Sequence, residues 1–359
     1  MQSVSDWPQN SQGYELENPI GYGAFGVVYS AITLSGPHQN KRVAIKTIDL
    51  EQFPDQNIEE LRKEIQIMRL CSHPNVISYH VCFISGKYFW MVMPLLEGGS
   101  VGNILKHKFP GGVKDEVLVA SILKEVLQGL NYFHQNHQIH RDIKSSNILM
   151  SSEGNVFLGD FGVAAKLKEG VNAKTFAGSP CWMAPEVIDN ENSQGYDYKA
   201  DIWSFGITAI ELVKGKPPLA DYPPMKVIIM AISKDPPQLS KSDHYDSAFK
   251  EIVNLCLQKD PSRRPTAEAL LRKKYFNKAK GSEYIRRHLL EYLPPLETRL
   301  PAPRAFEEFD DSQNLSSSGS GGWDFHLSGE FKAKKQEDPL EMIGTDEEDP
   351  LESICEDDD

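Results

Sequence analysis

The residues best suited to chemistry form a short polar run, His-Arg-Asp-Ile-Lys-Ser-Ser-Asn at 140–147, followed at a short interval by Asp-Phe-Gly at 160–162. These strings bring two carboxylates, an ammonium group and an amide close together between apolar segments. In phosphoryl transfer, an H-R-D-x-x-x-x-N string supplies a base and a magnesium ligand, and D-F-G supplies the main magnesium ligand. Either string alone could be a polar turn. Their order and spacing, with the motifs below, favour a phosphoryl-transfer site.

A glycine-rich stretch, Ile-Gly-Tyr-Gly-Ala-Phe-Gly-Val-Val-Tyr at 20–29, matches the pattern G-x-G-x-x-G. The dinucleotide-binding version of this pattern must open a helix and be followed about 20 residues later by an acidic residue. Here the glycines run directly into strand-forming residues, and Lys46 stands at the corresponding distance. The pattern therefore predicts a hairpin whose glycines let the backbone close over phosphates.

Lys46 ends a strand-forming segment, residues 43–46. With a period of two, Ala44 and Lys46 share one face. A small residue beside adenine and an ammonium group beside the phosphates can then line one cleft. The alternative is a surface lysine on an edge strand, which on spacing alone is the commoner case.

The segment after this strand has the pattern of an amphipathic helix. Asn57 and Glu60 form a capping box. The apolar stripe contains Ile58, Leu61, Ile65 and Met68. Glu64 lies on the flank of the stripe, where a carboxylate is costly unless it is paired. We expect Lys46 to be its partner.

Residues 88–93 are predicted to form a buried strand, and residues 94–99 a connector between two lobes. Adenine requires a backbone acceptor and a backbone donor at such a connector. Pro94 has a carbonyl but no N–H, so it can only accept, and Leu96 would donate. The alternative is a plain interdomain hinge, and the two roles are compatible.

Two later helices are predicted to belong to the core. One begins near Asp115 and carries apolar residues at helical spacing: Val119, Ile122, Leu123, Val126, Leu127, Leu130 and Phe133. The other opens at Asp201 and is apolar on all sides through Val213, which is typical of a buried helix. Between them, residues 156–158 form a short buried strand that presents Asp160 at its end.

Length and composition set the limits of these expectations. The chain has 359 residues, of which 40% are hydrophobic, so two lobes or domains with a sizeable core are expected. Neither a signal peptide nor an apolar run of about 20 residues is present, so we expect a soluble, cytoplasmic protein without membrane insertion. The five cysteines, at 71, 82, 181, 256 and 355, contain no CxxC pair. This favours a reducing compartment over a disulfide framework.

The net charge of −13 is concentrated at one end of the chain. Residues 305–359 contain 18 acidic and 3 basic residues, which leaves 33 acidic and 35 basic residues in the first 304. A nucleic-acid face would need clustered basic residues. No nucleic-acid partner is therefore expected.

Over residues 14–278 the chain resembles the eukaryotic protein kinase family. The motifs stand in the family's order: the glycine loop, Lys46, Glu64, the 140–147 run, Asp-Phe-Gly, and Ala-Pro-Glu at 184–186. The resemblance implies an α+β, bilobal protein kinase fold. It places a β-rich N-lobe and hinge at 14–96 and a helical C-lobe at 97–292. Composition predicts a flexible N-terminus at 1–13 and a proline-rich linker with a disordered acidic tail at 293–359.

The resemblance also implies a role for each motif residue. Lys46, held by Glu64, would contact the α- and β-phosphates of ATP, and Asn147 and Asp160 would hold Mg²⁺. Asp142 would accept the proton of the substrate hydroxyl, and Lys144, typical of the serine/threonine class, would stabilise charge on the γ-phosphoryl group. The implied ATP-binding residues are Ile20, Gly21, Gly23, Gly26, Val28, Ala44, Lys46, Glu64, Met93, Pro94, Leu96 and Leu149.

Residues 178–186 resemble the sterile-twenty-like germinal-centre kinases, and residues 201–212 and 222–227 resemble their oxidative-stress-responsive, or Frayed, branch. This branch responds to osmotic stress through upstream kinases. The likeness implies that Thr175 is an activating phosphosite clamped by Arg141, and that Ser179 faces the substrate.

The resemblance implies two structural contacts as well. Glu186 would pair with Arg264, and Asp201 would anchor the backbone of the catalytic loop. Gly159 stands where the branch usually has alanine, which is expected to loosen the turn at Asp160. A nucleotide-binding pseudokinase or scaffold is the alternative function. It would require the loss of Lys46, Asp142 or Asp160, and all three are present.

Two features stand out in the acidic tail. Trp323-Asp324-Phe325 resembles the peptide by which this branch docks on a helical-repeat scaffold protein, with Trp323 and Phe325 as anchors. Residues 337–343 recur as 348–354 with a shared Glu-Asp-Pro-Leu-Glu core. They could be partner motifs or a clamp on the kinase body, although a solvating acidic tail is the simpler interpretation. The chain printed here ends at residue 359, so the folded C-terminal docking domain of this branch is not expected within it.

Overall fold

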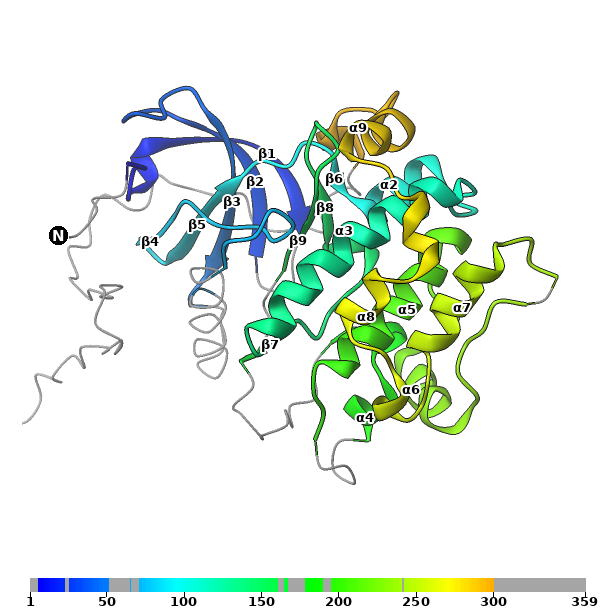
Figure 1. Ribbon diagram of the computed structural model, residues 1–359. Helices are drawn as coiled ribbons and strands as arrows, with labels where there is room; N and C mark the ends of the chain where they lie inside the picture. Colours follow the sequence, from blue (N-terminus) through cyan, green and yellow to red (C-terminus); the bar gives the residue numbers. More distant parts are fainter. Residues whose placement is uncertain are drawn as a thin grey trace, which may run out of the picture. The chain divides into compact units, whose positions relative to one another are not determined.

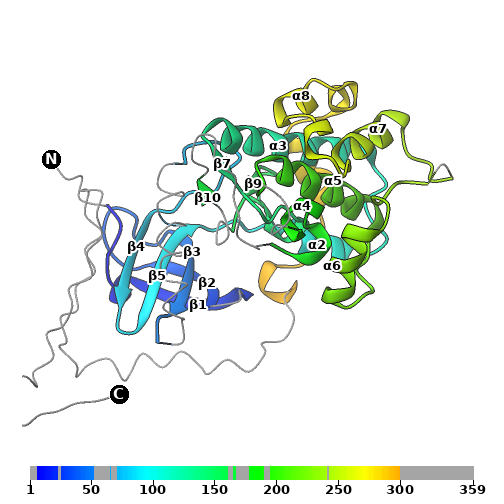
Figure 2. The same ribbon diagram turned by 90° about the horizontal axis from the view of Figure 1, so that it is seen from below.

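The computed structural model describes residues 6–22, 26–51, 65, 71–160, 165–166, 178–189, 195–240 and 242–299. Figures 1 and 2 show a strand-rich part followed by a mostly helical part. This agrees with the α+β, bilobal fold expected from the sequence. The proposed lobe boundary, after residue 96, falls in the connector between strands β5 and β6.

The first part is one antiparallel sheet with the strand order β1-β2-β3-β5-β4. Its strands are β1 (Tyr14–Tyr22), β2 (Gly26–Thr33), β3 (Arg42–Asp49), β4 (Val81–Ser85) and β5 (Tyr88–Pro94). The register of β1 against β2 shifts on either side of Pro19, whose nitrogen cannot donate to the ladder. Ile45 and Val92, a pair between the central strands β3 and β5, are fully buried.

Residues 6–13 pack against this sheet, although the polar N-terminus was expected to be flexible. The Trp7 ring stacks on His38 and on His80, each at 4.0 Å between ring centroids. The Tyr14 hydroxyl donates to the Pro8 carbonyl over 2.8 Å, and a short 3-10 turn, η1 (Ser11–Gly13), leads into β1. Aromatic stacking supplies contact area that the polar composition does not reveal.

The second part contains α2 (Val101–Lys108), α3 (Glu116–Gln135), α4 (Pro185–Ile188), α5 (Lys199–Lys214), α6 (Pro224–Ser233), α7 (Ser247–Cys256), α8 (Ala267–Leu271) and α9 (Ser282–Ile285). Its short strands are β6 (Gly99–Ser100), β7 (Gln138–Ile139), β8 (Ile148–Met150), β9 (Val156–Leu158) and β10 (Ala165–Lys166). Its 3-10 turns are η2 (Ser145–Asn147), η3 (Pro180–Trp182), η4 (Pro261–Arg263), η5 (Lys274–Lys278) and η7 (Leu296–Arg299), and η6 (Arg286–Leu290) is a π-helical turn.

Both predicted core helices are confirmed. Asp115 caps α3, because its side chain accepts from the backbone N–H groups of Val117 and Leu118. The seven apolar residues predicted along α3 are all fully buried. Helix α5 is buried from Ala200 to Val213 and ends at Gly215, whose φ of 81° favours glycine. It begins at Lys199, two residues before the predicted start.

Only one residue of the helix predicted around residues 57–68 belongs to the described part. Ile65 is helical and buried, as expected for the apolar stripe. Asn57, Glu60 and Glu64 lie outside the described residues. Within the part of the chain that the structure describes, no helix combines the length and the apolar character needed to cross a membrane.

Candidate active site

The polar run at 140–147 follows β7, and a side chain of helix α5 holds its backbone by hydrogen bonds. Asp201, fully buried, accepts the backbone N–H of His140 through Oδ2 over 2.9 Å and that of Arg141 through Oδ1 over 2.8 Å. The His134 ring, on α3, contacts the same Oδ2 at 2.9 Å. Arg141 has a φ of 69°, a left-handed conformation that needs support from its surroundings. The expected anchoring role of Asp201 is confirmed.

The charge state of this anchor follows from its hydrogen bonds. Burial by itself would raise the pKa of Asp201, but the hydrogen bond and charge of His134, together with His140, outweigh burial, and the pKa is lowered. Burial lowers the pKa of the His140 imidazole. Asp201 is therefore an ionised acceptor close to the His140 ring, which is largely uncharged.

The two carboxylate oxygens of Asp142 have different surroundings. Oδ2 accepts from Lys144 Nζ over 2.6 Å and from Asn147 Nδ2 over 2.9 Å. Oδ1 is buried and has no hydrogen-bond partner among the described residues. Asn147 Nδ2 also donates to the Asp142 carbonyl over 2.8 Å. The carboxylate is thus held through one oxygen, while the other makes no hydrogen bond to a described residue.

Lys144 joins this carboxylate to the segment before helix α4. Its Nζ contacts Ser179 Oγ at 2.6 Å, the same distance as to Asp142 Oδ2. The serine that stands at the expected substrate-facing position keeps a hydroxyl in contact with Lys144. A hydroxyl substrate placed near Asp142 would therefore lie within reach of a positive charge.

Asp160 follows strand β9, and its neighbour Gly159 is hydrogen-bonded to the loop at 140–147. The Gly159 N–H donates to the Asn147 carbonyl over 3.0 Å, and the Asp160 charge acts on the pKa of His140. Asp160 itself has a φ of 60°. A Cβ at Gly159 would meet Leu149 Cδ1 at 2.8 Å, so the glycine permits close packing beside the strand β8 residue that is expected to contact ATP.

Asn147 and Asp160 have the donor chemistry that Mg²⁺ prefers. The Asn147 amide nitrogen points at Asp142, so its oxygen is the atom that remains for a cation. Mg²⁺ is usually held by one or two protein oxygens, with water and phosphate completing its shell. No group of three His, Cys, Asp or Glu side chains suited to a metal occurs among the described residues, and the small ligand set fits this mode of binding.

The sheet brings the remaining ATP-binding candidates together in pairs. Val28 on β2 lies opposite Gly21 on β1 and opposite Lys46 on β3. Ala44 lies opposite Met93, and Ile20 is in the same part of β1 as Gly21. These pairings place a small residue, an ammonium group and two apolar side chains on neighbouring strands.

Gly26, the last glycine of the loop, has a steric reason to be glycine. A Cβ at this position would lie 2.0 Å from the Thr47 carbonyl oxygen. The strand β2 therefore approaches β3 more closely here than any side chain would permit. Gly23, the middle glycine, lies outside the described residues.

The connector is held by a residue that the sequence analysis missed. Arg299, 2% exposed, donates to the carbonyls of Gly98 over 3.1 Å and Glu97 over 3.3 Å. Pro94 pairs with Val43 at the end of β5, and Leu96 accepts from the Gly99 N–H. The segment 293–299, expected to belong to a proline-rich linker, thus packs on the connector. Its prolines, Pro294 and Pro295, gave no signal of this contact.

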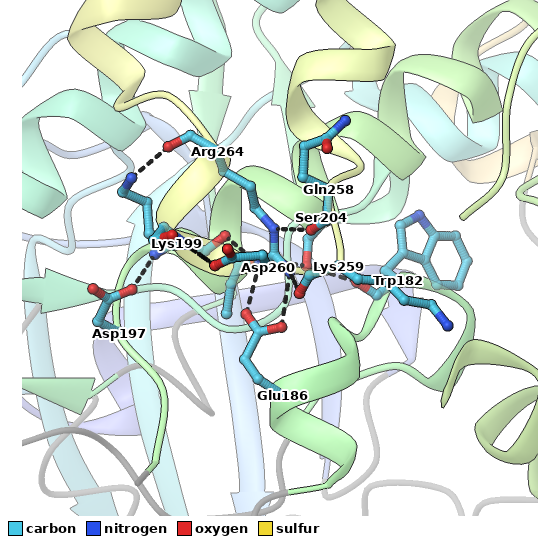
Figure 3. A network of polar contacts seen from close by, with 11 residues as sticks. Trp182, Glu186, Asp197, Lys199, Ser204, Gln258, Lys259, Asp260 and Arg264 are labelled. Atoms are coloured by element: carbon cyan, nitrogen blue, oxygen red, sulfur yellow. Dashed lines mark hydrogen bonds and ion pairs between the residues drawn. The ribbon is translucent and has the colours of Figure 1, made fainter. Parts of the chain in front are cut away.

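The predicted pair of Glu186 and Arg264 is confirmed, and Figure 3 shows its surroundings. The guanidinium contacts both carboxylate oxygens, at 2.5 and 2.8 Å, and also donates to the Gln258 and Lys199 carbonyls. Nearby, the Ser204 hydroxyl donates to the Trp182 carbonyl over 2.7 Å. A bidentate pair of this kind is strong and directional, so it fixes α4 against the helical part.

Arg141 was expected to clamp Thr175 once that residue is phosphorylated. Its Nη1 contacts the Tyr196 hydroxyl at 3.5 Å. Thr175, Glu64, Trp323 and Phe325 lie outside the described residues, so their predicted roles stay predictions.

Comparison with known proteins places this geometry in a family. Residues 14–276 match the protein kinase domain, a span that includes every described site residue except Arg299. The chain belongs to the protein kinase family. This confirms the resemblance stated from the motifs and the fold that it implied.

This kinase is 47% identical to serine/threonine-protein kinase fray2 of Dictyostelium discoideum, over 82% of this chain and 28% of the relative. It is 45% identical to germinal center kinase 3 of Caenorhabditis elegans, over 80% and 51% of the two chains. It is 43% identical to serine/threonine-protein kinase sid1 of Schizosaccharomyces pombe, over 76% and 56%. The chain spans between about a quarter and just over half of the length of these relatives. Its kinase domain is of the serine/threonine class, as predicted.

Proposed function

We propose that this kinase transfers the γ-phosphate of ATP to serine and threonine hydroxyls of proteins in a stress or osmotic signalling cascade. The observation that carries the proposal is the Asp142 carboxylate. One of its oxygens is held by Lys144 and Asn147, while the other is buried and available. A base that must receive a hydroxyl proton needs this combination of fixed position and free acceptor.

The chain's own residues perform most of the work by positioning. Asp142 Oδ1 orients the substrate hydroxyl and takes its proton as the oxygen attacks the γ-phosphorus, while the bond to the bridging oxygen breaks and ADP leaves. Lys144, which bridges Asp142 and Ser179, offsets the charge that develops on the transferred group. Asn147 and Asp160 would hold Mg²⁺, which neutralises charge on the phosphates when bound. Lys46 would contact the α- and β-phosphates from the sheet.

The first prediction concerns Asp142→Asn. The amide cannot accept the hydroxyl proton, so kcat should fall about 10²- to 10⁴-fold, while ATP binding stays close to wild type. A radiometric peptide assay and calorimetric titration with ATP measure the two quantities. Unchanged turnover would reject the assignment. The pseudokinase alternative predicts that the wild type binds ATP without any transfer that this substitution could remove.

The motif likeness around Thr175 also supports a regulatory proposal. An upstream kinase phosphorylates Thr175, and the phosphate then binds the Arg141 guanidinium through charge-assisted hydrogen bonds. Because Arg141 directly precedes Asp142, the new ion pair would order the catalytic loop.

The second prediction is that Thr175→Ala abolishes activation by an upstream activating kinase, since no phosphate can form at that position. Activity is measured on a peptide array before and after treatment with the activator and ATP. Thr298→Ala, an exposed threonine far along the chain, is the matched control and should be activated like wild type. Full activation of Thr175→Ala would contradict the proposal.

For partners, we propose that Trp323-Asp324-Phe325 binds a helical-repeat scaffold protein. Two aromatic anchors around one acid suit an apolar pocket with a basic rim. Loss of binding in the Trp323→Ala variant, measured by calorimetry with the scaffold, would support the assignment. A wild-type affinity for the scaffold in that variant would contradict the assignment.

A further inference from the structure

A cavity of about 310 Å³ opens between the connector and the segment 293–299. Its walls come from Leu95, Glu97 and Gly98 of the connector, from Arg42 on β3, and from side chains of residues 290–299. None of the described residues that are expected to bind ATP lines this cavity. Its volume lies near the lower limit for ligand pockets, about 300 Å³. The cavity is therefore separate from the nucleotide site, and it has room for a few side chains.

One wall of the cavity is aliphatic. It is built by Leu95, Leu290, Leu293, Pro294, Pro295 and Leu296. The two prolines are exposed, and only Leu296 among the six is buried. Covering apolar surface that faces water is favourable. The wall therefore favours a ligand with aliphatic side chains.

Carboxylates dominate the exposed charge at the rim of the cavity. Arg42 contacts three of them at once, those of Glu17, Glu97 and Glu297, at 3.3, 3.2 and 3.3 Å. These contacts are longer than the ~2.7–2.9 Å of a strong charge-assisted hydrogen bond. All four side chains are partly exposed, so each pair is weak. One guanidinium leaves this group with an excess of two negative charges, which a cationic ligand group would balance.

Arg299 also lines the cavity, but its terminal nitrogens bind the protein itself. They donate to the carbonyls of Glu97 and Gly98 and to the side chain of Asn103. Its Nε is buried and has no hydrogen-bond partner among the described residues. A buried N–H without an acceptor is costly. An extended peptide carries main-chain carbonyls at regular intervals, so it is a suitable ligand beside such a donor.

We propose that this cavity, called here the connector pocket, is a docking site for a basic and aliphatic segment of a partner protein. Arginine or lysine side chains of the segment bind Glu97 and Glu297 at the rim, and the leucine or proline side chains that follow pack on the aliphatic wall. Charge complementarity selects this partner, because an acidic segment would meet the excess of negative charge. The pocket acts by binding alone, so the inference does not depend on phosphoryl transfer at Asp142.

The experiment measures binding of a fluorescein-labelled peptide, Arg-Arg-Pro-Leu-Leu, to the full chain by fluorescence anisotropy. Mg²⁺ and a non-hydrolysable ATP analogue fill the nucleotide site throughout. Two matched peptides are the controls: Glu-Glu-Pro-Leu-Leu reverses the charge, and Arg-Arg-Pro-Ser-Ser removes the aliphatic side chains. We expect saturable binding of the first peptide and a Kd at least about 10-fold higher for each control. Equal binding of all three peptides overturns the proposal.

The variant Glu297→Lys assigns the binding to the connector pocket. The Kd of Arg-Arg-Pro-Leu-Leu should rise about 10-fold or more, because like charges brought together at an interface repel strongly, while Tm stays near the wild-type value. Glu268→Lys is the matched control. It reverses an exposed acid that pairs with Arg272 on helix α8 and the residue that follows it, and it should bind the peptide like wild type. An unchanged Kd in Glu297→Lys, or an equal loss in both variants, overturns the proposal.

A second variant keeps the test decisive if Glu297→Lys fails to fold. Glu17→Gln removes one carboxylate from strand β1 without adding a charge, and it should weaken binding by a smaller factor. Raising the ionic strength from about 0.05 M to about 0.3 M should also weaken binding, because the Debye length falls. An unchanged Kd in Glu17→Gln, with an affinity that salt does not alter, overturns the proposal.

The Asp142→Asn protein separates this inference from the proposed function. It should bind the peptide with the wild-type Kd although its turnover is lost. Retained turnover in Asp142→Asn rejects the catalytic assignment and leaves the docking site supported by its own binding data. A wild-type protein that phosphorylates substrates but does not bind Arg-Arg-Pro-Leu-Leu rejects the docking site alone.

Discussion

At the scale of single residues, this kinase depends on carboxylates whose individual oxygens have different partners. Asp142 keeps one oxygen occupied and one available. Asp201 uses both oxygens on the backbone of the catalytic loop, and Glu211 uses both on the loop and on Trp182. The chemistry of the site therefore follows from which donors reach each oxygen, more than from the number of acids present.

The third prediction concerns Asp201→Asn. An amide has one acceptor oxygen, and its NH₂ group would face a backbone N–H. One hydrogen bond to a charged acceptor is therefore lost, and two donors point at each other. We expect a loss of about 2–3 kcal/mol in the free energy of unfolding, measured by urea denaturation at pH 7, with a parallel fall in kcat.

The pH dependence of this effect has a definite sign. The folded-state pKa of Asp201 is lowered from 3.8, so its contribution is fully present above that value and is lost as pH falls through the lower folded-state pKa. The stability difference between wild type and Asp201→Asn should therefore shrink as pH is lowered below about 4. A difference that stays constant into that range would contradict the interpretation.

At the scale of elements, α3 and α5 form the platform of the site. They contact one another, α3 leads directly into β7 and the catalytic loop, and α5 provides both Asp201 and Glu211. Helix α5 is buried on all sides from Ala200 to Val213, which leaves it no freedom to shift toward solvent. The acids that it carries are consequently placed by hydrophobic packing.

The fourth prediction tests this platform. Leu127, on α3, is fully buried, so Leu127→Ala should leave a cavity and lower the free energy of unfolding by about 2–5 kcal/mol. Leu34→Ala is the matched control, because Leu34 is 42% exposed and its loss should change stability by about 0.5 kcal/mol or less. Equal effects in urea titrations of the two variants would contradict the assignment of α3 to the core.

At the scale of the whole molecule, the segment near residue 299 connects parts that are far apart along the chain. Arg42 on β3 forms ion pairs with Glu17, Glu97 and Glu297. These pairs are partly exposed, so each contributes little alone. Arg299 is buried, and burial lowers its pKa. Its hydrogen bonds to the connector carbonyls are shielded from water, unlike the partly exposed pairs of Arg42.

The fifth prediction is that Arg299→Ala raises KM for ATP by about 10-fold, a change of about 1.4 kcal/mol, because the connector that would bind adenine loses its support. Steady-state kinetics with varied ATP measure the effect. Arg272→Ala removes an arginine from an exposed pair and should leave KM unchanged. A wild-type KM in Arg299→Ala would show that the segment 293–299 does not contribute to nucleotide binding.

Much of the fold could be predicted because it depends on local patterns. The apolar spacing of α3, the continuous apolar run of α5 and the glycine that ends it all follow from periodicity and backbone chemistry. The packing of residues 6–13 and 293–299 could not, since composition reports only low hydrophobicity there. A few contacts, from Trp7 and Arg299, hold these segments in place.

The sequence by itself determined the chemistry: the order and spacing of the motifs specified a kinase domain, its base Asp142, its lysines and its magnesium ligands as predictions. The tertiary structure decided which of the remaining polar residues support that chemistry. Glu211 meets Ser145 and Trp182, and Arg299 meets Gly98, across separations of 66, 29 and 201 residues. Such contacts arise only when distant segments pack together, and no local pattern encodes them.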